Sequence, residues 1–327
     1  MTGPTTVAQD AIAARIRQLT GRSLSAPPVV VADTSDFMAI DRDHVVDLEG
    51  ELFLVTLTER EKRFGLVDEP KFWVKRAISL ASGRTHILKM VFHERFRACV
   101  GANAFICARD AEKEARVLEL MRGDPRFMQG RGLRDVRGNL VRVIDFITGE
   151  DLLRHLERAG LGHEEYFRTV FPSVFARTMD SLRAIERLHE AGLCHGDIRN
   201  DHILLEAGSG RFVWIDFDLN EDTPLFDVWS LGNLLHCVVG NGFVVFRDVV
   251  ERRPDLAGRL TDDDASVFFT HRVMNLRAVY PYIPAALNDV LLRFSCGARS
   301  RYDSTSQVIE DLGACAAVEG WPLGGAG

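Results

Sequence analysis

A dense group of charged and polar side chains lies between two apolar segments. It follows a helical pattern that Gly192 ends, and it precedes the apolar run 203–205. A second apolar run, Trp214-Ile215, ends on Asp216. Two acids at strand ends about 20 residues apart suit a hairpin that brings Asp197 and Asp216 to one metal–phosphate site. The members of the group are His195, Asp197, Arg199, Asn200, Asp201 and His202.

A β-hairpin is expected before these residues, between positions 72 and 92. Two runs rich in β-branched and aromatic residues flank a Ser-Gly turn at Ser82-Gly83. Lys89 lies inside the second apolar run, so its ammonium is either on a solvated face or directed at an anion. Lys75, on the partner strand, is the rival candidate for that role.

Longer patterns predict how the rest of the chain is laid out. Apolar residues at helical spacing predict helices over 8–21, 110–122, 164–191 and 227–239, and strands are expected at 45–57 and 140–147. Asp110 and Asp151 are suited to cap helices. Strands dominate up to about residue 150 and helices follow, which indicates an α+β fold with two lobes.

Composition limits the class of protein. The 327 residues are 46% hydrophobic and 27% charged, as in globular chains, and the net charge of −7 argues against a nucleic-acid partner. The six cysteines form no CxxC pair, which is typical of free thiols in a reducing compartment. The sequence shows neither a signal-peptide pattern nor a run of about 18 apolar residues, so we expect a cytoplasmic protein without a membrane span.

Taken together, these features resemble the protein-kinase superfamily. The run from Leu188 to Asp197 is similar to the approach to the kinase catalytic loop, with Gly196 where protein kinases usually have Arg, as in aminoglycoside-phosphotransferase-type kinases. Asp216-Phe217-Asp218 lies where kinases have Asp-Phe-Gly. The run Asp227-Val228-Trp229-Ser230-Leu231-Gly232 resembles the buried helix of eukaryotic-type kinases.

The resemblance implies an organisation of the chain. It predicts a bilobal protein-kinase-like fold of the α+β class, with a strand-rich N-lobe over 66–147 and a helical C-lobe over 148–315. Residues 1–65 would be an N-terminal extension with a helix and strands, and residues 316–327 a flexible tail.

It also implies roles in ATP-dependent phosphoryl transfer. Asp197 would take the proton of the attacking hydroxyl, unless it only caps the loop. Arg199 would stabilise the transferring phosphoryl group, unless it forms a plain salt bridge. Lys89, oriented by Glu114, would bind the α- and β-phosphates.

The remaining implied roles concern the nucleotide, the metal and the loop itself. Asp145 and Ile147, in a hinge-like segment, would contact ATP. Asp216 would hold Mg²⁺ or Mn²⁺, unless it only forms a turn. His195 and Asp227 would be structural, with the buried acid bonded to the loop backbone.

Three features depart from the family pattern. His202 stands where the family has its second metal-binding Asn, and imidazole suits zinc, manganese or iron better than Mg²⁺. Either the metal differs, or Asn200 or Asp201 substitutes, or activity is weak. Between residues 60 and 74 Gly65 is the only glycine, so a glycine-rich loop is missing. Asp216 and Asp227 are 227 − 216 = 11 positions apart, which leaves no room for a long activation segment.

We therefore expect an ATP-dependent phosphotransferase that transfers the γ-phosphate to a hydroxyl-bearing acceptor. A protein Ser/Thr is the first expectation because the helix from Asp227 resembles that of protein kinases. A small-molecule acceptor is the alternative that the missing activation segment favours. A further alternative is a pseudokinase that serves as a binding or scaffold module, which His202 and the missing glycine-rich loop favour.

Overall fold

The computed structural model describes residues 6–62, 68–100, 103–220 and 223–324, which fall into two compact units. Unit 1 comprises Met1–Glu94, Asp110–Gly123 and Met128–Phe146. Unit 2 comprises Arg95–Arg109, Asp124–Phe127 and Ile147–Gly327. Strands prevail in the first and helices in the second, so the predicted α+β class is confirmed. The predicted divisions at residues 65 and 315 stay predictions.

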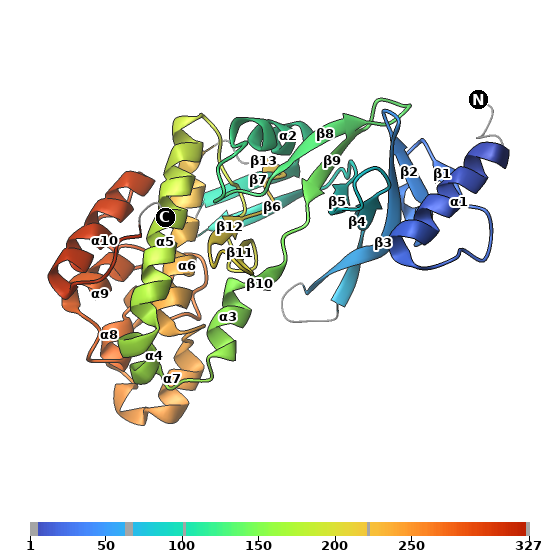
Figure 1. Ribbon diagram of the computed structural model, residues 1–327. Coiled ribbons are helices and arrows are strands. Elements are labelled where there is room, and N and C mark those ends of the chain that lie inside the picture. The colour runs from blue at the N-terminus through green and yellow to red at the C-terminus, as the bar shows by residue number, and fades with distance from the viewer. Residues whose placement is uncertain (1–5, 63–67, 101–102, 221–222, 325–327) are drawn as a thin grey trace. The chain divides into compact units, whose positions relative to one another are not determined.

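Unit 1 is built on a seven-stranded sheet, counted over the described residues, with the order β1-β2-β3-β4-β5-β9-β8 (Figure 1). The pair β1/β2 is parallel and the other neighbours are antiparallel. Gly83, in the β4–β5 turn, has a φ of +74°, in the left-handed region that glycine tolerates. The strands are β1 (Val30–Val31), β2 (Val45–Leu48), β3 (Glu51–Lys62), β4 (Asp68–Ser79), β5 (Thr85–Lys89), β8 (Gly130–Arg134) and β9 (Leu140–Asp145).

Both faces of this sheet carry apolar side chains. On one face Phe53, Leu88 and Val143 belong to a buried core. On the other face Leu54 packs with Ile16 of α1 (Thr6–Thr20). Because side chains alternate along a strand, Lys89 lies on the face opposite Leu88.

The helix α2 (Ala111–Leu120) completes unit 1 together with a short 3₁₀ helix (Phe37–Ala39). Asp110 caps α2, since its carboxylate accepts hydrogen bonds from the backbone N–H groups of Glu112 and Lys113. The predicted cap is confirmed.

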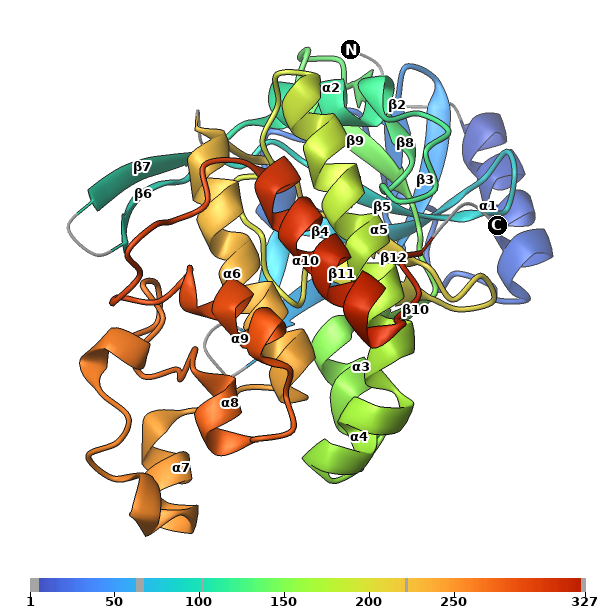
Figure 2. The ribbon, with the colours of Figure 1, turned by 90° about the vertical axis from the view of Figure 1, so that its left-hand side faces the viewer.

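Unit 2 combines helices with two small sheets, of order β10-β11-β12 and β13-β7-β6. Figure 2 shows α10 lying against α5, and the two helices are in contact. The strands are β6 (Arg95–Val100), β7 (Asn103–Arg109), β10 (Gly149–Asp151), β11 (Ile203–Glu206), β12 (Phe212–Trp214) and β13 (Leu219–Asn220). The α-helices are α3 (Leu152–Arg158), α4 (His163–Thr169), α5 (Phe171–Glu190), α6 (Pro224–Gly240), α7 (Phe246–Arg252), α8 (Leu276–Val279), α9 (Ala285–Leu292) and α10 (Thr305–Glu319), with 3₁₀ turns at Pro254–Leu256 and Asp262–Asp264.

One helix prediction is wrong in its extent. The single helix expected over 164–191 is two helices, α4 and α5, which meet at Val170. Pro172, in the first turn of α5, has no backbone N–H and its ring obstructs a continuous helix. The apolar stripe continues across the break, which is why the spacing alone predicts one helix.

The hairpin β6–β7 is an addition that the sequence patterns did not indicate. It precedes α2 in the chain, yet β7 pairs with β13 in unit 2.

Among the described helices of both units, none is long and apolar enough to cross a membrane.

Candidate active site

The charged and polar residues 195–202 form a loop between the end of α5 and the β11–β12 hairpin, and all of these segments belong to unit 2. We call it the charged loop. Gly192, just past α5, has a φ of +72°, and the next residue donates its N–H to the carbonyl of Leu188. Beyond the loop, Ile203 of β11 pairs with Trp214 of β12. The N–H of Ile215 then bonds the carbonyl of His202, which fixes the loop beside the segment that follows β12.

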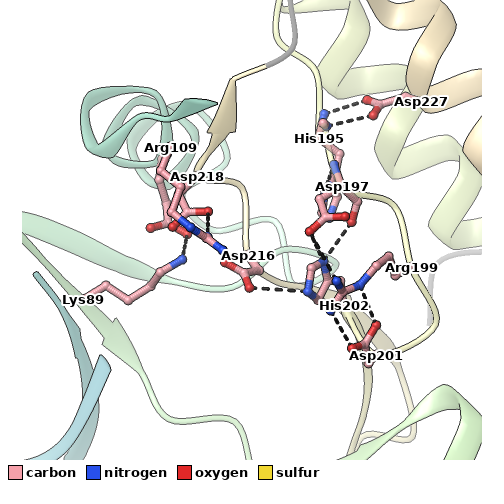
Figure 3. Close-up of polar contacts among 12 residues, drawn as sticks. Lys89, Arg109, His195, Asp197, Arg199, Asp201, His202, Asp216, Asp218 and Asp227 are labelled. Atoms are coloured by element: carbon pink, nitrogen blue, oxygen red, sulfur yellow. Dashed lines mark hydrogen bonds and ion pairs between the residues drawn. The ribbon is translucent and has the colours of Figure 1, made fainter. Parts of the chain in front are cut away.

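This arrangement brings two of the predicted acids to one imidazole (Figure 3). Nδ1 of His202 lies 3.5 Å from Oδ2 of Asp197, and Nε2 lies 3.4 Å from Oδ2 of Asp216. His202 is 4% exposed. The ring therefore stands between the two carboxylates, in the position where the resemblance places a metal-binding Asn.

The hydrogen bonding of His202 determines which nitrogen is available. Nδ1 lies 2.8 Å from the backbone carbonyl of Asp197, a group that only accepts, so Nδ1 carries the proton and donates. In the neutral ring, Nε2 then presents its lone pair toward Asp216. A histidine that ligates a metal commonly donates its other N–H in this way. Nε2 of His202 and Oδ2 of Asp216, 3.4 Å apart, are therefore the two atoms of this group that could share a cation, and an imidazole nitrogen favours Mn²⁺ or Zn²⁺ over Mg²⁺.

Arg199 forms a two-point salt bridge within the same loop. Its Nε and Nη2 donate to the two carboxylate oxygens of Asp201, at 3.0 and 2.7 Å, while Nη1 lies 3.8 Å from Asp197. Burial tends to raise the pKa of Asp201, but the charges of His202 and Arg199 outweigh it and hold that pKa below its ordinary value. Arg199 thus forms a salt bridge within the loop, and its role toward a phosphoryl group stays a prediction.

Asp227 of α6 holds the loop backbone by two hydrogen bonds. Its carboxylate accepts the N–H groups of His195 and Gly196, at 2.6 and 2.8 Å, and lies 2.9 Å from Nε2 of His189. Burial would raise the pKa of Asp227, but the hydrogen bond from His189 and the neighbouring imidazoles lower it below its usual value. Gly196 has a φ of +83°, a conformation for which glycine is favoured.

His189, Cys194 and Asp227 also place possible metal-binding atoms within 4.8 Å of one another. Nε2 of His189 is already bonded to Asp227, and Nδ1 lies 3.2 Å from the hydroxyl of Thr305. With both ring nitrogens engaged, the cluster is a hydrogen-bonded support for the loop.

The segment after β12 is held by packing and by an ion pair. Asp216 has a φ of +68°, and the buried ring of Phe217 lies 4.5 Å from the ring of His195. Asp218 pairs with Arg109 of β7 at 2.8 Å. Spacing could not reveal Arg109, which is 109 positions away. The sequence does show an acid at position 218, where kinases have Gly. A buried acid needs a cationic partner, so this residue indicates that such a partner exists without identifying it as Arg109.

Unit 1 contains a second charged cluster, centred on Glu114 of α2. Nζ of Lys89 lies 2.8 Å from Oε1 of Glu114, and Nε of Arg142 lies 3.0 Å from Oε2. Lys75, the rival candidate, points to the opposite face of the sheet and donates to the hydroxyl of Thr58. The structure thus pairs Glu114 with Lys89, and it adds Arg142, which sequence reasoning missed.

The two residues predicted to contact ATP lie near the end of β9. The carboxylate of Asp145 lies 3.3 Å from Arg84, and its backbone N–H bonds the carbonyl of Gln129. Ile147 begins the last stretch of unit 2. Contact with a nucleotide stays a prediction for both residues. Gly65 lies outside the described residues.

Comparison with known families finds a model described as "Lipopolysaccharide kinase (Kdo/WaaP) family", which matches residues 176–235. The matched stretch contains Asp197, His202, Asp216 and Asp227, and thus the whole loop with its support.

Curated proteins with similar sequences are kinases. "Putative ribosomal protein S6 kinase alpha-2" of Caenorhabditis elegans is 30% identical over 115 residues, which are 34% of this chain and 14% of that protein. "Serine/threonine-protein kinase RAD53" of Saccharomyces cerevisiae is 26% identical over 164 residues, 48% of this chain and 18% of that protein. The alignments therefore span less than a fifth of these relatives' own lengths.

A solved structure described as "Crystal structure of Rad53 1-466 in complex with AMP-PNP" is also similar. It has a TM-score of 0.46 and 17% sequence identity, and the superposition covers 73% of this chain and 60% of that one.

Proposed function

Since this chain is a member of the protein-kinase-like superfamily, we propose that it is a phosphotransferase that moves the γ-phosphate of ATP to a hydroxyl group. The observation that carries the proposal is the convergence of Asp197 and Asp216 on His202, in a loop whose backbone Asp227 fixes. Phosphoryl transfer requires positioning and charge neutralisation more than covalent help from the protein, and a rigid loop of this kind provides positioning.

Asp197 is the residue we assign to the acceptor. Its side chain is 29% exposed, so a hydroxyl can reach it, whereas His202 and Asp216 beside it are more buried. The carboxylate would accept a hydrogen bond from the attacking hydroxyl and take its proton. Arg199, 3.8 Å away, limits how far that carboxylate can turn.

Asp216 and His202 would hold the divalent cation. When bound, the ion neutralises negative charge on the phosphates of ATP. The protein's contribution is the orientation of the donors: the carbonyl of Asp197 keeps the proton on Nδ1 of His202, so that Nε2 is the ligand. Of the two ions that commonly accompany ATP, this pair of donors favours Mn²⁺ over Mg²⁺.

Lys89 would bind the α- and β-phosphates of ATP. Glu114 orients the lysine by a buried ion pair of 2.8 Å, and Arg142 in turn fixes Glu114. A lysine fixed in this way loses little side-chain entropy when a phosphate binds.

For the acceptor we propose a hydroxyl of a saccharide. Asp227 follows Asp216 by only 11 positions, and this short stretch already contains β13, the α6 N-cap Thr223 and the first three residues of α6, 224–226. No long activation segment, on which protein kinases bind their peptide substrates, fits between the two acids. The family model that matches residues 176–235 is described as a lipopolysaccharide kinase, and its match includes this segment.

A protein Ser/Thr hydroxyl is the second candidate. It is favoured by the similarity to curated Ser/Thr kinases, which extends over up to about half of this chain.

Transfer of label from [γ-³²P]ATP with Mn²⁺ or Mg²⁺ tests the proposal. The acceptors are deacylated lipopolysaccharide and a mixture of Ser- and Thr-containing peptides. We expect label in the saccharide. Label in the peptides alone would establish the second candidate. Nucleotide-induced thermal stabilisation without transfer to either acceptor would make the chain a binding module, as the pseudokinase alternative expects.

A further inference from the structure

A pocket of about 430 Å³ opens in unit 1, where the ends of β3, β4, β5, β8 and β9 meet the end of α2. This volume is in the range of sites for small molecules. We call it the arginine pocket. Its charged and imidazole side chains are Arg84, Arg122, Arg131, His86, Glu51 and Asp145.

The arginine pocket is separate from the surface that carries Lys89. His86 of β5 pairs in register with Asp145 of β9, and Leu88 pairs with Val143. Alternate residues of a strand point to opposite faces, so His86 and Asp145 lie on the face of Leu88. Lys89 lies on the other face. The pocket is therefore distinct from the phosphate-binding position assigned to Lys89.

The arginines of the pocket retain donors for a ligand. Arg131 pairs with Glu51, and Arg84 pairs with Asp145 at 3.3 Å. Each of the two makes one side-chain hydrogen bond within the described ranges, although a guanidinium has five N–H groups. The guanidinium of Arg122 has no ion-pair or hydrogen-bond partner among the described residues. Three cationic groups thus face two carboxylates.

His86 adds a buried polar atom that lacks a partner. Its side chain is 6% exposed, and Nδ1 lies 3.2 Å from Oδ1 of Asp145 without the geometry of a hydrogen bond. Burial lowers the pKa of this imidazole. Buried polar atoms in proteins are normally hydrogen-bonded, so an unsatisfied one beside a pocket marks a place where a ligand or water completes the bonding.

We propose that the arginine pocket binds a small phosphate ester, of sugar-phosphate size, whose phosphate is held by Arg84, Arg122 and Arg131. Guanidinium groups match the geometry of phosphate oxygens and bind them by paired N–H···O bonds. The three guanidinium groups outnumber the two carboxylates of the pocket, and this excess of positive charge favours an anionic ligand. The rest of the ligand would lie against His86. This binding is independent of the proposed transfer reaction.

Calorimetric titration with inorganic phosphate, ribose 5-phosphate and ribose tests the proposal on the full chain. We expect ribose 5-phosphate to bind, inorganic phosphate to bind more weakly, and ribose not to bind. If inorganic phosphate bound as tightly as ribose 5-phosphate, the pocket would be a site for the phosphate ion alone, and the proposed contact with the rest of an ester would be wrong. Absence of binding by either phosphate compound at millimolar concentration would overturn the proposal.

Two matched variants locate the binding. Arg122→Gln removes a guanidinium that makes no ion pair or hydrogen bond with the described residues, and it should weaken the binding of ribose 5-phosphate about tenfold without affecting folding. Arg134→Gln, on β8, removes a guanidinium that pairs with Glu112 outside the pocket, and it should leave the affinity unchanged. Equal affinity in wild type and Arg122→Gln would contradict the proposal. The ring resonances of His86 should also shift on binding, and their invariance would contradict contact with the ligand.

Discussion

The charged clusters of the two units are built in opposite ways. In unit 1 an anion, Glu114, is held between two cations, Lys89 and Arg142, and the three side chains are 0%, 7% and 2% exposed. In unit 2 two anions, Asp197 and Asp216, share one imidazole and are 29% and 14% exposed. A cluster of alternating charge is stabilised by its own members. Two carboxylates beside one imidazole carry a net negative charge, which attracts a cation.

This difference separates two tasks of a phosphotransferase. The cluster of unit 1 keeps Lys89 in one position before any ligand arrives. In the proposed reaction the cluster of unit 2 would receive an ion and an acceptor, while the rigidity of its loop comes from Asp227, which bonds the loop backbone and not the acids. Stability should therefore depend on Glu114 and Asp227, and metal preference on His202.

Glu114→Ala should give the largest loss of stability. The change leaves Lys89 and Arg142 buried without their carboxylate, and breaking a buried ion pair typically costs about 3–5 kcal/mol. Urea unfolding followed by circular dichroism measures the loss. Glu112→Ala is the matched control, because Glu112 lies on the same helix in an exposed pair with Arg134 and should contribute less than about 1 kcal/mol. Equal losses in the two variants would show that the cluster of unit 1 is not a buried ionic network.

Asp227→Asn should have the next largest effect. The carboxylate accepts two backbone N–H groups, so its neutral replacement should lower the free energy of unfolding by about 2–3 kcal/mol at pH 7. The pKa of Asp227 is lower in the folded chain than in the unfolded chain. Its contribution is therefore complete above the unfolded pKa of about 3.9 and is lost as the pH falls through the folded value.

Unfolding of wild type and Asp227→Asn between pH 7 and pH 3 checks this sign. The difference in stability should narrow as the pH falls. Asp255→Asn provides the comparison, because Asp255 lies on the surface and its pKa is also lowered, chiefly by the hydrogen bond from Arg253. It should alter stability little at any pH. A difference that widens in acid would mean that Asp227 is not the charged acceptor of the loop.

His202→Asn should have the smallest effect, on metal choice. Replacing the imidazole by an amide oxygen donor should shift preference from Mn²⁺ toward Mg²⁺ by about tenfold. The ratio of ATP-dependent transfer rates with the two metals measures the shift. His155→Asn is the control, because His155 of α3 pairs with Glu150 and is not assigned to the metal. This variant should leave the ratio of the Mn²⁺ and Mg²⁺ rates unchanged. An unchanged ratio in His202→Asn would remove this residue from the metal site.

The features that sequence predicts best are those that local geometry determines. The cap at Asp110, the Ser-Gly turn and the hairpin of β11 and β12 all depend on residues close together in the chain. The convergence of Asp197 and Asp216 follows from that hairpin, because the loop before β11 and the segment after β12 must meet.

The features that it missed depend on contacts distant in sequence. Arg142 reaches Glu114 across 28 positions, and Arg109 reaches Asp218 only because β7 pairs with β13. The break at Val170 was hidden because an apolar stripe records which face is buried and not whether the backbone is continuous. A single sequence carries no spacing rule for such pairs.

The most direct test of the proposed reaction is single-turnover transfer of γ-phosphate by Asp197→Ala. Removing a general base typically slows transfer by about 10²–10⁴-fold, while the affinity for ATP should be unchanged because Asp197 is not assigned to the nucleotide. Asp180→Ala is the control. It removes a carboxylate of α5 that is 39% exposed, and this variant should transfer the γ-phosphate at the wild-type rate. Transfer at the wild-type rate in Asp197→Ala would contradict the assignment of this loop as the phosphoryl-transfer centre.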